Sequence, residues 1–328
     1  MNEISALYRH CTLCPKDCGI DRLSGQRGYC RMSGDMFIAS AVLHRGEEPP
    51  LSGLNGSGAI FFSGCTLGCT FCQNIQISCP SGGLMGAGVS ADELSEIMLT
   101  LENRGAANIN LVTATQFTPS VIDALKAARR HGLGIPVAWN SSGYESVETI
   151  KSLAGIVDIW LPDLKTLDVG LSGRLFGAPD YPAAAASALK AMAASLVAGG
   201  GTFLEDDIMR RGMIMRHLVL PGHVETSIDV LRWYAENLMG TAMLSLMVQY
   251  TPVNEAGARI ASSGYMISEA DYEKLLCALE DFGIDEGFIQ EPEAADSKWI
   301  PDFSRLNPFP ADYSMPVWHW REGHLPKV

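Results

Sequence analysis

The sequence predicts an α/β fold: an incomplete (β/α)6, TIM-like barrel with a small N-terminal cysteine-rich module and an irregular C-terminal tail. Two observations predict the barrel. Six short apolar runs, of the near-continuous kind that a parallel sheet buried on both faces requires, alternate with amphipathic helical patterns. They lie between residues 58 and 290, which is less chain than the roughly 250 residues of a full eight-stranded barrel. We therefore expect six strand–helix units.

The expected strands and helices follow one another along this segment. The strands are 59–63, 108–113, 135–139, 156–161, 213–220 and 243–250. The helices are 90–105, 118–132, 144–155, 181–200, 224–238 and 268–283. Ser90 and Glu93 are spaced to form a capping box, and Pro119 is placed to open a helix. Gly105 and Gly132 come just after two helical patterns, where glycine commonly ends a helix.

Three regions differ in composition. Residues 1–50 are rich in cysteine and turn residues, with little helical or strand periodicity, and form the expected metal-binding module. Residues 51–290 form the expected barrel. Residues 291–328 contain too many prolines for a helix, and we expect this proline- and tryptophan-rich tail to pack on the barrel.

Composition narrows the function classes. Of the 328 residues 47% are hydrophobic and 19% are charged, which is typical of a globular chain. A net charge of -13 disfavours nucleic acid and anionic membranes as partners. The chain begins without a signal-peptide core and has no apolar run of roughly 20 residues, so we expect a cytoplasmic protein. Eight of its nine cysteines lie within the first 79 residues, which favours metal chemistry over disulfides in a reducing compartment.

Three cysteines, Cys65, Cys69 and Cys72, follow the first expected barrel strand. Disulfides use cysteines in pairs, and a structural zinc site uses four ligands. A cubane iron–sulfur cluster is usually held by four thiolates, so three would leave one iron open. Gly64 and Gly68 allow the loop to fold tightly around such a cluster. The loop also lies at the carboxyl end of a strand, where β/α barrels carry their chemistry.

The Cys-x3-Cys-x2-Cys pattern, with Phe71 before the last cysteine, resembles the signature of the radical S-adenosylmethionine (radical SAM) superfamily. This resemblance implies a [4Fe–4S] cluster whose open iron is chelated by S-adenosylmethionine. It also implies reductive cleavage of that cofactor and release of a 5′-deoxyadenosyl radical, which abstracts hydrogen from the substrate. The cofactors would carry the chemistry, and the protein would position and shield them. A flavodoxin- or ferredoxin-type protein would supply the electron.

From residue 11 to about residue 290 the chain resembles the activating enzymes of glycyl-radical enzymes, particularly proteins similar to pyruvate formate-lyase activating enzyme. Four further segments carry this resemblance: "TATQ" (113–116), "WNSSGY" (139–144), "DIWLPDLK" (158–165) and "MRHLVLPG" (215–222). The cofactor-binding residues that it implies are Phe71, Thr113, Thr115, Gln116, Asn140, Ser142, Asp163, Lys165 and Arg216.

One of these segments departs from the superfamily pattern. "TATQ" stands where a Gly-Gly-Glu motif usually holds the amino group of the cofactor. Thr113, Thr115 and Gln116 are substitutes without a negative charge, and Asp163 is the expected carboxylate partner. Asn140 and Ser142 would contact the ribose, and Arg216 the cofactor carboxylate. The alternative for Asp163 and Lys165 is a solvated ion pair.

The remaining cysteines form a second group. Cys11, Cys14, Cys18 and Cys30 have spacings that match a metal knuckle, which would stabilise a module too small to fold on its own core. The metal is either a second [4Fe–4S] cluster or zinc, and the alternative is four reduced thiols. Cys79 is expected to be an unligated thiol, and Cys277 a residue at the flank of a helix. His217 and His223 are expected to be packed or surface histidines.

The predicted function is therefore that of a radical SAM oxidoreductase. Its substrate is either a glycine in a glycyl-radical enzyme or a small molecule or peptide. A hypothesis of another class is a non-catalytic iron–sulfur protein that transfers electrons or assists assembly. Such a carrier normally closes its cluster with four protein thiolates, and Cys79 would have to be the fourth.

Overall fold

The computed structural model describes residues 3–78, 83–260, 267–292 and 297–326. This part of the chain folds as an α/β protein around one mixed sheet, with the strand order β10-β9-β8-β6-β5-β4-β2-β1-β11-β12. β3 (Ala87–Val89) and β7 (Phe203–Glu205) pair with β1 and β8 outside this path. No helix in these residues is long and apolar enough to cross a bilayer.

Seven strands of the sheet are parallel and follow one another in chain order. They are β2 (Ser57–Phe62), β4 (Ile109–Val112), β5 (Val137–Ser141), β6 (Ile159–Pro162), β8 (Ile208–Leu218), β9 (Met243–Met247) and β10 (Gly287–Ile289). The first six overlap the six predicted strands. Because the strands are parallel, their carboxyl ends lie along one edge of the sheet, and the loops after them meet there.

Two segments predicted to be irregular contain strands, so the prediction was wrong at these places. β1 (Met36–His44) pairs antiparallel with β2, and β11 (Ser314–His319) pairs antiparallel with β1 and with β12 (Gly323–His324). β1 was missed because nearly all of its residues are buried, which removes the alternating pattern of a half-buried strand. Pro316 is tolerated in β11 because the two-residue β12 does not reach it, which leaves that part at the sheet edge.

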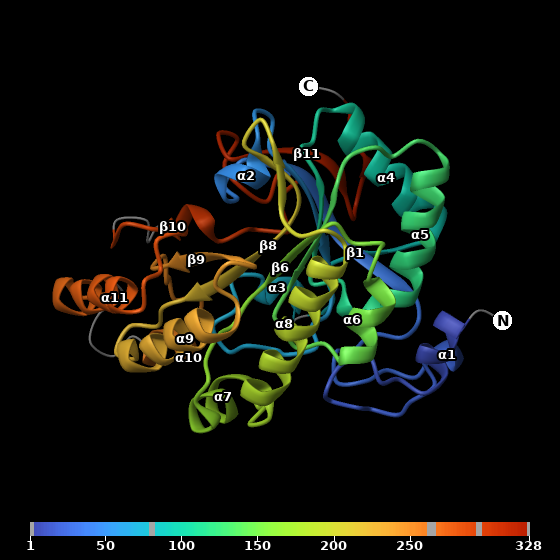
Figure 1. Cartoon of the computed structure of the whole chain (residues 1–328). Helices are drawn as coiled ribbons and strands as arrows, with labels where there is room; N and C mark the ends of the chain where they lie inside the picture. Colours follow the sequence, from blue (N-terminus) through green and yellow to red (C-terminus); the bar gives the residue numbers. More distant parts are fainter. Residues whose placement is uncertain (1–2, 79–82, 261–266, 293–296, 327–328) are drawn as a thin grey trace.

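The six predicted helices are present with slightly shorter bounds. They are α4 (Ala91–Asn103), α5 (Thr118–Arg130), α6 (Val147–Leu153), α8 (Tyr181–Ala198), α9 (Val224–Asn237) and α11 (Glu269–Asp281). Ser90 and Glu93 form the predicted capping box. The prediction missed α1 (Glu3–Arg9), α2 (Pro49–Ser52), α3 (Ile75–Ser78), α7 (Val169–Phe176) and α10 (Glu255–Ile260). Figure 1 shows α4, α5 and α6 along one side of the sheet, with α9 and α11 beyond β9.

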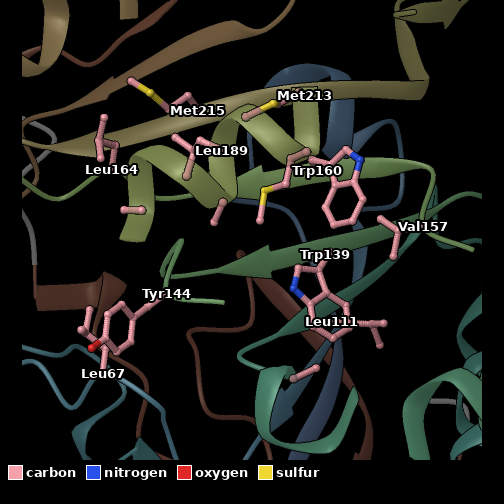
Figure 2. Close-up of a cluster of buried hydrophobic side chains, with 14 of the residues drawn as sticks. Leu67, Leu111, Trp139, Tyr144, Val157, Trp160, Leu164, Leu189, Met213 and Met215 are labelled. Atoms are coloured by element: carbon pink, nitrogen blue, oxygen red, sulfur yellow. The ribbon is translucent and has the colours of Figure 1, made fainter. Parts of the chain in front are cut away.

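The two faces of the sheet carry two different cores. Trp139 and Trp160 are fully buried on the face toward α8, where Leu189 packs with Met213 and Met215 of β8 (Figure 2). The alternate residues of the same strands face the other way. That second core contains Leu51 of α2 together with Ala138, Ile159, Leu161, Met209 and Ile214. On β5 this second face becomes polar at the carboxyl end of the strand, where Asn140 follows Ala138.

His217 is buried on β8, and from its burial we predict that the free energy of unfolding depends on pH. Its Nδ1 lies 2.7 Å from the Leu164 carbonyl and its Nε2 2.9 Å from the Ser227 hydroxyl, and burial lowers its pKa to about 4. The unfolded chain therefore binds an extra proton between pH 6.5 and 4. The contribution of His217 to stability should be constant above pH 6.5 and fall by about 3 kcal/mol as the pH drops toward 4.

Urea unfolding at pH 7 and pH 4.5 checks this prediction. In His217→Gln the pH dependence should be clearly smaller than in the wild type. His131→Gln, on the surface after α5, is the control and should keep the wild-type dependence. An unchanged dependence in His217→Gln contradicts the assignment.

Candidate cluster and cofactor site

One cavity of about 680 Å³ lies at the carboxyl edge of the parallel strands, within the size range of small-molecule sites. Ten of the predicted barrel-site residues line it: Cys65, Cys69, Phe71, Cys72, Thr113, Asn140, Ser142, Asp163, Lys165 and Arg216. A second hollow, of about 820 Å³, is lined by residues around Arg129 and Asp158 and includes none of the predicted site residues.

The loop after β2 presents the three cysteines to the cavity. Gly64 has a φ of +80°, and its N–H donates to the Ile77 carbonyl at 2.8 Å, which turns the chain sharply after the strand. Within the loop the Leu67 N–H donates to the Cys65 sulfur at 3.4 Å. An amide aimed at a ligand sulfur is a common feature of iron–sulfur sites.

The three thiols fit a cluster better than a single ion. Burial, together with Cys72, raises the pKa of Cys65 to about 11, and burial also raises the pKa values of Cys69 and Cys72. Such thiols become thiolates only when a metal binds them. In the described part of the chain, no three His, Cys, Asp or Glu side chains are grouped to hold one metal ion. Thiolates of a cubane each bind a different iron, so they stand farther apart than the ligands of one ion.

Asp163 and Lys165, at the end of β6, form an ion pair in the wall of the cavity. The Lys165 Nζ lies 2.5 Å from the Asp163 Oδ2, and their side chains are only 17% and 24% exposed. Burial opposes the charge of Lys165, but Asp163 and Cys69 raise its pKa above the ordinary value. The Tyr181 hydroxyl holds this turn, because the Lys165 N–H donates to it at 2.9 Å. The pair is therefore largely shielded from solvent.

Only one side chain of the "TATQ" segment predicted to bind the cofactor lines the cavity, and the other two are buried outside it. Thr113 lines the cavity, and its N–H donates to the Asn140 carbonyl at 2.9 Å. Thr115 and Gln116 are buried and point elsewhere. The Thr115 hydroxyl donates to Glu145 at 2.7 Å, and the Gln116 amide donates to the Ser63 and Gly64 carbonyls, each at 3.1 Å. Gln116 thus supports the start of the cysteine loop.

Arg216 enters the cavity from β8 with two partners that the sequence analysis missed. Its Nε donates to Glu48 at 2.8 Å, and its Nη2 donates to Glu47 and to Glu48. Burial acts to raise the pKa of Glu47, but Arg216 and His44 lower it well below its usual range. The only sequence signal was the pair of glutamates before Pro49, in a segment predicted to be irregular.

The N-terminal cysteines are brought near one another. Cys11, Cys14 and Cys30 are buried and Cys18 is half-buried. Burial, with smaller contributions from the other three thiols, raises the pKa of Cys14 to about 12. These four thiols, too, are not grouped around one ion in the described residues. Cys79 lies outside the described residues, and Cys277 is exposed.

The N-terminal segment contacts the loop that carries Cys65, Cys69 and Cys72. The Tyr29 hydroxyl donates to the Leu67 carbonyl at 3.4 Å. Buried Arg22 donates to the carbonyl of Gln116 and, at 2.6 Å, to that of Ser33. The N-terminal segment is therefore in direct contact with the cysteine loop through Tyr29 and with the "TATQ" segment through Arg22.

Metal content tests the N-terminal group. If Cys11, Cys14, Cys18 and Cys30 share a metal, Cys14→Ser should lower the total metal and leave the barrel cluster in place. Two cubanes correspond to about eight irons per chain, and one cubane with a zinc staple to about four irons and one zinc. Wild-type protein with about four irons, no zinc and four reactive N-terminal thiols would refute a shared site.

Comparison with known proteins relates part of the chain to a family. The family model of the radical SAM superfamily matches residues 59–193, which include the cysteine loop and the ends of β2, β4, β5 and β6. This part of the chain is thus similar to the radical SAM superfamily. The predicted cofactors, a [4Fe–4S] cluster and S-adenosylmethionine, are those of this superfamily.

Several known proteins resemble the chain. An uncharacterized protein of Methanocaldococcus jannaschii is 26% identical over 286 residues, which cover 85% of this chain and 77% of that protein. Streptococcus suis SuiB bound to its precursor peptide SuiA is 15% identical, with a TM-score of 0.47 over 69% of this chain and 46% of SuiB. A domain of pyruvate-formate lyase-activating enzyme from Bacteroides vulgatus is 14% identical, with a TM-score of 0.38 over 54% of this chain and 92% of the domain. The chain thus spans less than half the length of SuiB.

Proposed function

We propose that the protein is a radical SAM oxidoreductase whose [4Fe–4S] cluster is held by Cys65, Cys69 and Cys72. The observation that carries this proposal is the convergence of these three thiols with the polar strand ends in one cavity. When bound, the reduced cluster and S-adenosylmethionine supply a 5′-deoxyadenosyl radical for hydrogen abstraction. Three thiolates leave one iron of the cluster open to the cofactor. The four thiolates of an electron carrier would leave none open.

The chain offers distinct contacts to each part of S-adenosylmethionine. Asp163 uses one carboxylate oxygen for Lys165, so its other oxygen remains for the ammonium group. Arg216 binds the two glutamates through Nε and Nη2, and we assign its Nη1 to the carboxylate of the cofactor. Thr113 and the amide and hydroxyl of Asn140 and Ser142 are assigned to polar atoms of the cofactor, including the ribose.

Phe71 gives this site an apolar wall. Its ring centroid lies 6.1 Å from that of Phe176 and 6.0 Å from that of Tyr250, so the aromatic group holds Phe71 in place beside Cys72. A wall of this kind excludes water from the cysteine loop, and exclusion of water protects a reactive radical from side reactions.

The proposal extends to the architecture, the reductant and the substrate. The uninterrupted order of the parallel strands supports an incomplete barrel curved around the cavity. We retain three parts, 1–50, 51–290 and 291–328, with the last packed on the barrel. The reductant is a flavodoxin- or ferredoxin-type protein in the cytoplasm. The substrate is a glycine of a glycyl-radical enzyme, as the activating-enzyme resemblance implies, or a small molecule or peptide.

Anaerobic turnover tests the proposed function. Protein reconstituted with iron and sulfide should convert S-adenosylmethionine to 5′-deoxyadenosine in the presence of dithionite. If the barrel loop binds its cluster and no 5′-deoxyadenosine forms, the protein is an electron-transfer or assembly protein and the proposal is wrong. The same assay without reductant is the control.

The assignment of Asp163 predicts a loss of cofactor affinity. Asp163→Asn keeps the shape and removes the charge, and charge-assisted hydrogen bonds contribute about 1.5–3 kcal/mol. The affinity for S-adenosylmethionine, measured by equilibrium binding to the reconstituted protein, should fall by roughly tenfold or more. The iron content should stay at the wild-type level, because no cluster ligand is changed.

Thr115→Val is the matched comparison, because it removes a hydroxyl that bonds Glu145 and lies outside the cavity. It should lower the free energy of unfolding by about 1–3 kcal/mol, since buried Glu145 loses a partner, and should change cofactor affinity less than Asp163→Asn does. Wild-type affinity in Asp163→Asn with severe loss in Thr115→Val would reverse the assignment.

A further inference from the structure

One part of the cavity wall, formed by His44, Glu47, Glu48 and Arg216, carries an excess of negative charge, and we call it the floor. Glu47 and Glu48 face a single guanidinium, that of Arg216, and the three side chains are only 9%, 7% and 12% exposed. Elsewhere in the cavity wall, Asp163 and Lys165 balance each other. The Asp, Glu, Lys and Arg side chains that line the cavity are thus three carboxylates and two cations, beside His44, which is charged only when protonated. A buried, uncompensated carboxylate is costly unless a cation joins it.

His44 supplies a second observation at the same place. Its ring lines the cavity and is 8% exposed, yet its Nε2 has no hydrogen-bond partner in the described residues. The Nδ1 atom lies 3.5 Å from Glu47, and Asn110 donates to the same carboxylate at 3.0 Å. Buried polar atoms nearly always have partners, so an imidazole Nε2 without one points to a missing polar group.

The wall above the floor is aromatic. Phe61, Trp299 and Phe309 line the cavity there, and the Phe309 ring centroid lies 4.7 Å from that of His44. Aromatic faces attract cations and also accept the alkyl chain that carries one. The floor and the wall therefore favour the same kind of ligand.

We propose that this floor, formed by His44, Glu47 and Glu48 with Arg216, binds a cationic amine of the substrate. This inference rests on the proposed function and names its substrate class. An ammonium group has three donors, which match the free lone pairs of the glutamates and an imidazole nitrogen. An anionic group of the substrate would meet two carboxylates, because Arg216 Nη1, the nitrogen that binds neither glutamate, is assigned to the cofactor. A metal ion is disfavoured because these side chains are not grouped around one ion in the described part of the chain.

Three probes of equal chain length test the charge preference: pentan-1-amine, pentan-1-ol and pentanoate. Each is titrated into the reconstituted protein saturated with S-adenosylmethionine, so that the amine cannot occupy the ammonium site of the cofactor. Pentan-1-amine should bind at least tenfold more tightly than pentan-1-ol, and pentanoate should bind most weakly. Equal affinities for amine and alcohol, or tighter binding of pentanoate, would overturn the proposal.

A variant tests whether the floor is the source of the preference for the amine. Glu47→Gln removes one negative charge and leaves Arg216 paired with Glu48, so the preference for the amine should shrink to less than threefold. The control is Glu205→Gln, an exposed partner of Arg210 in the other hollow, which should keep the wild-type preference. A full preference in Glu47→Gln would refute this floor as its source. If Glu47→Gln does not fold, the three probes on wild-type protein still decide the proposal.

The outcomes separate this inference from the proposed function, because binding is measured without turnover. Formation of 5′-deoxyadenosine with no preference for the amine rejects only the floor. Preference for the amine with no 5′-deoxyadenosine rejects only the radical chemistry.

Discussion

Cys69→Ser should reduce 5′-deoxyadenosine formation by reconstituted protein by at least about a hundredfold. Loss of a contact outside the ligand set typically costs 10- to 100-fold in metal affinity or activity, and loss of a ligand costs more. Cys69 is the most buried of the three, 8% exposed, and a serine oxygen there is a poor substitute for a soft thiolate. Cys65→Ser and Cys72→Ser should have effects of the same size.

The assay measures 5′-deoxyadenosine by chromatography and iron per chain on the same samples. Cys277→Ser is the matched control, since this cysteine is exposed on α11 and should be neutral in both measurements. If a triple variant of Cys65, Cys69 and Cys72 still forms 5′-deoxyadenosine at the wild-type rate, the assignment of the cluster is wrong.

Gly64→Ala should have the second large effect, because Gly64 lies at the start of the cysteine loop and packs against the N-terminal segment. Gly64 has a φ of +80°, and a Cβ there would lie 2.6 Å from the Met32 side chain and 2.8 Å from the Cys30 carbonyl oxygen. The left-handed conformation costs an alanine about 1–2 kcal/mol, and the overlap adds about 1–3 kcal/mol. The variant should be less stable by about 2–5 kcal/mol and should retain less iron.

Gly132→Ala separates the cost of the left-handed conformation from the cost of the steric overlap. Gly132 also has a positive φ, of +102°, but a Cβ there would meet nothing within 4 Å. Its loss of stability should be limited to the conformational cost, and its iron content should equal that of the wild type. Urea unfolding and iron analysis measure both variants. Equal losses in the two variants would show that the contact between Gly64 and the N-terminal segment contributes nothing.

The sequence determined the features that depend on neighbouring residues. The six parallel strands were predicted from mainly apolar runs of five to eight residues, and the helices from periodicity with capping signals such as Ser90. The placement of Cys65, Cys69 and Cys72 at a strand end followed directly, because a loop after a buried parallel strand lies at the carboxyl edge of the sheet. These inferences need no knowledge of distant contacts.

The tertiary structure decided which polar side chains face the cavity. Thr113 and Thr115 are two residues apart, yet the left-handed backbone of Thr113 and the short helix at Thr115–Phe117 send Thr115 to Glu145. Glu47 and Glu48 reach Arg216 across 168 or more residues of chain, after β1 and α2 have packed on the sheet. Periodicity and spacing report only local geometry. The charge of the cavity floor arises from contacts between distant segments, so it could be recognised only once the chain had folded.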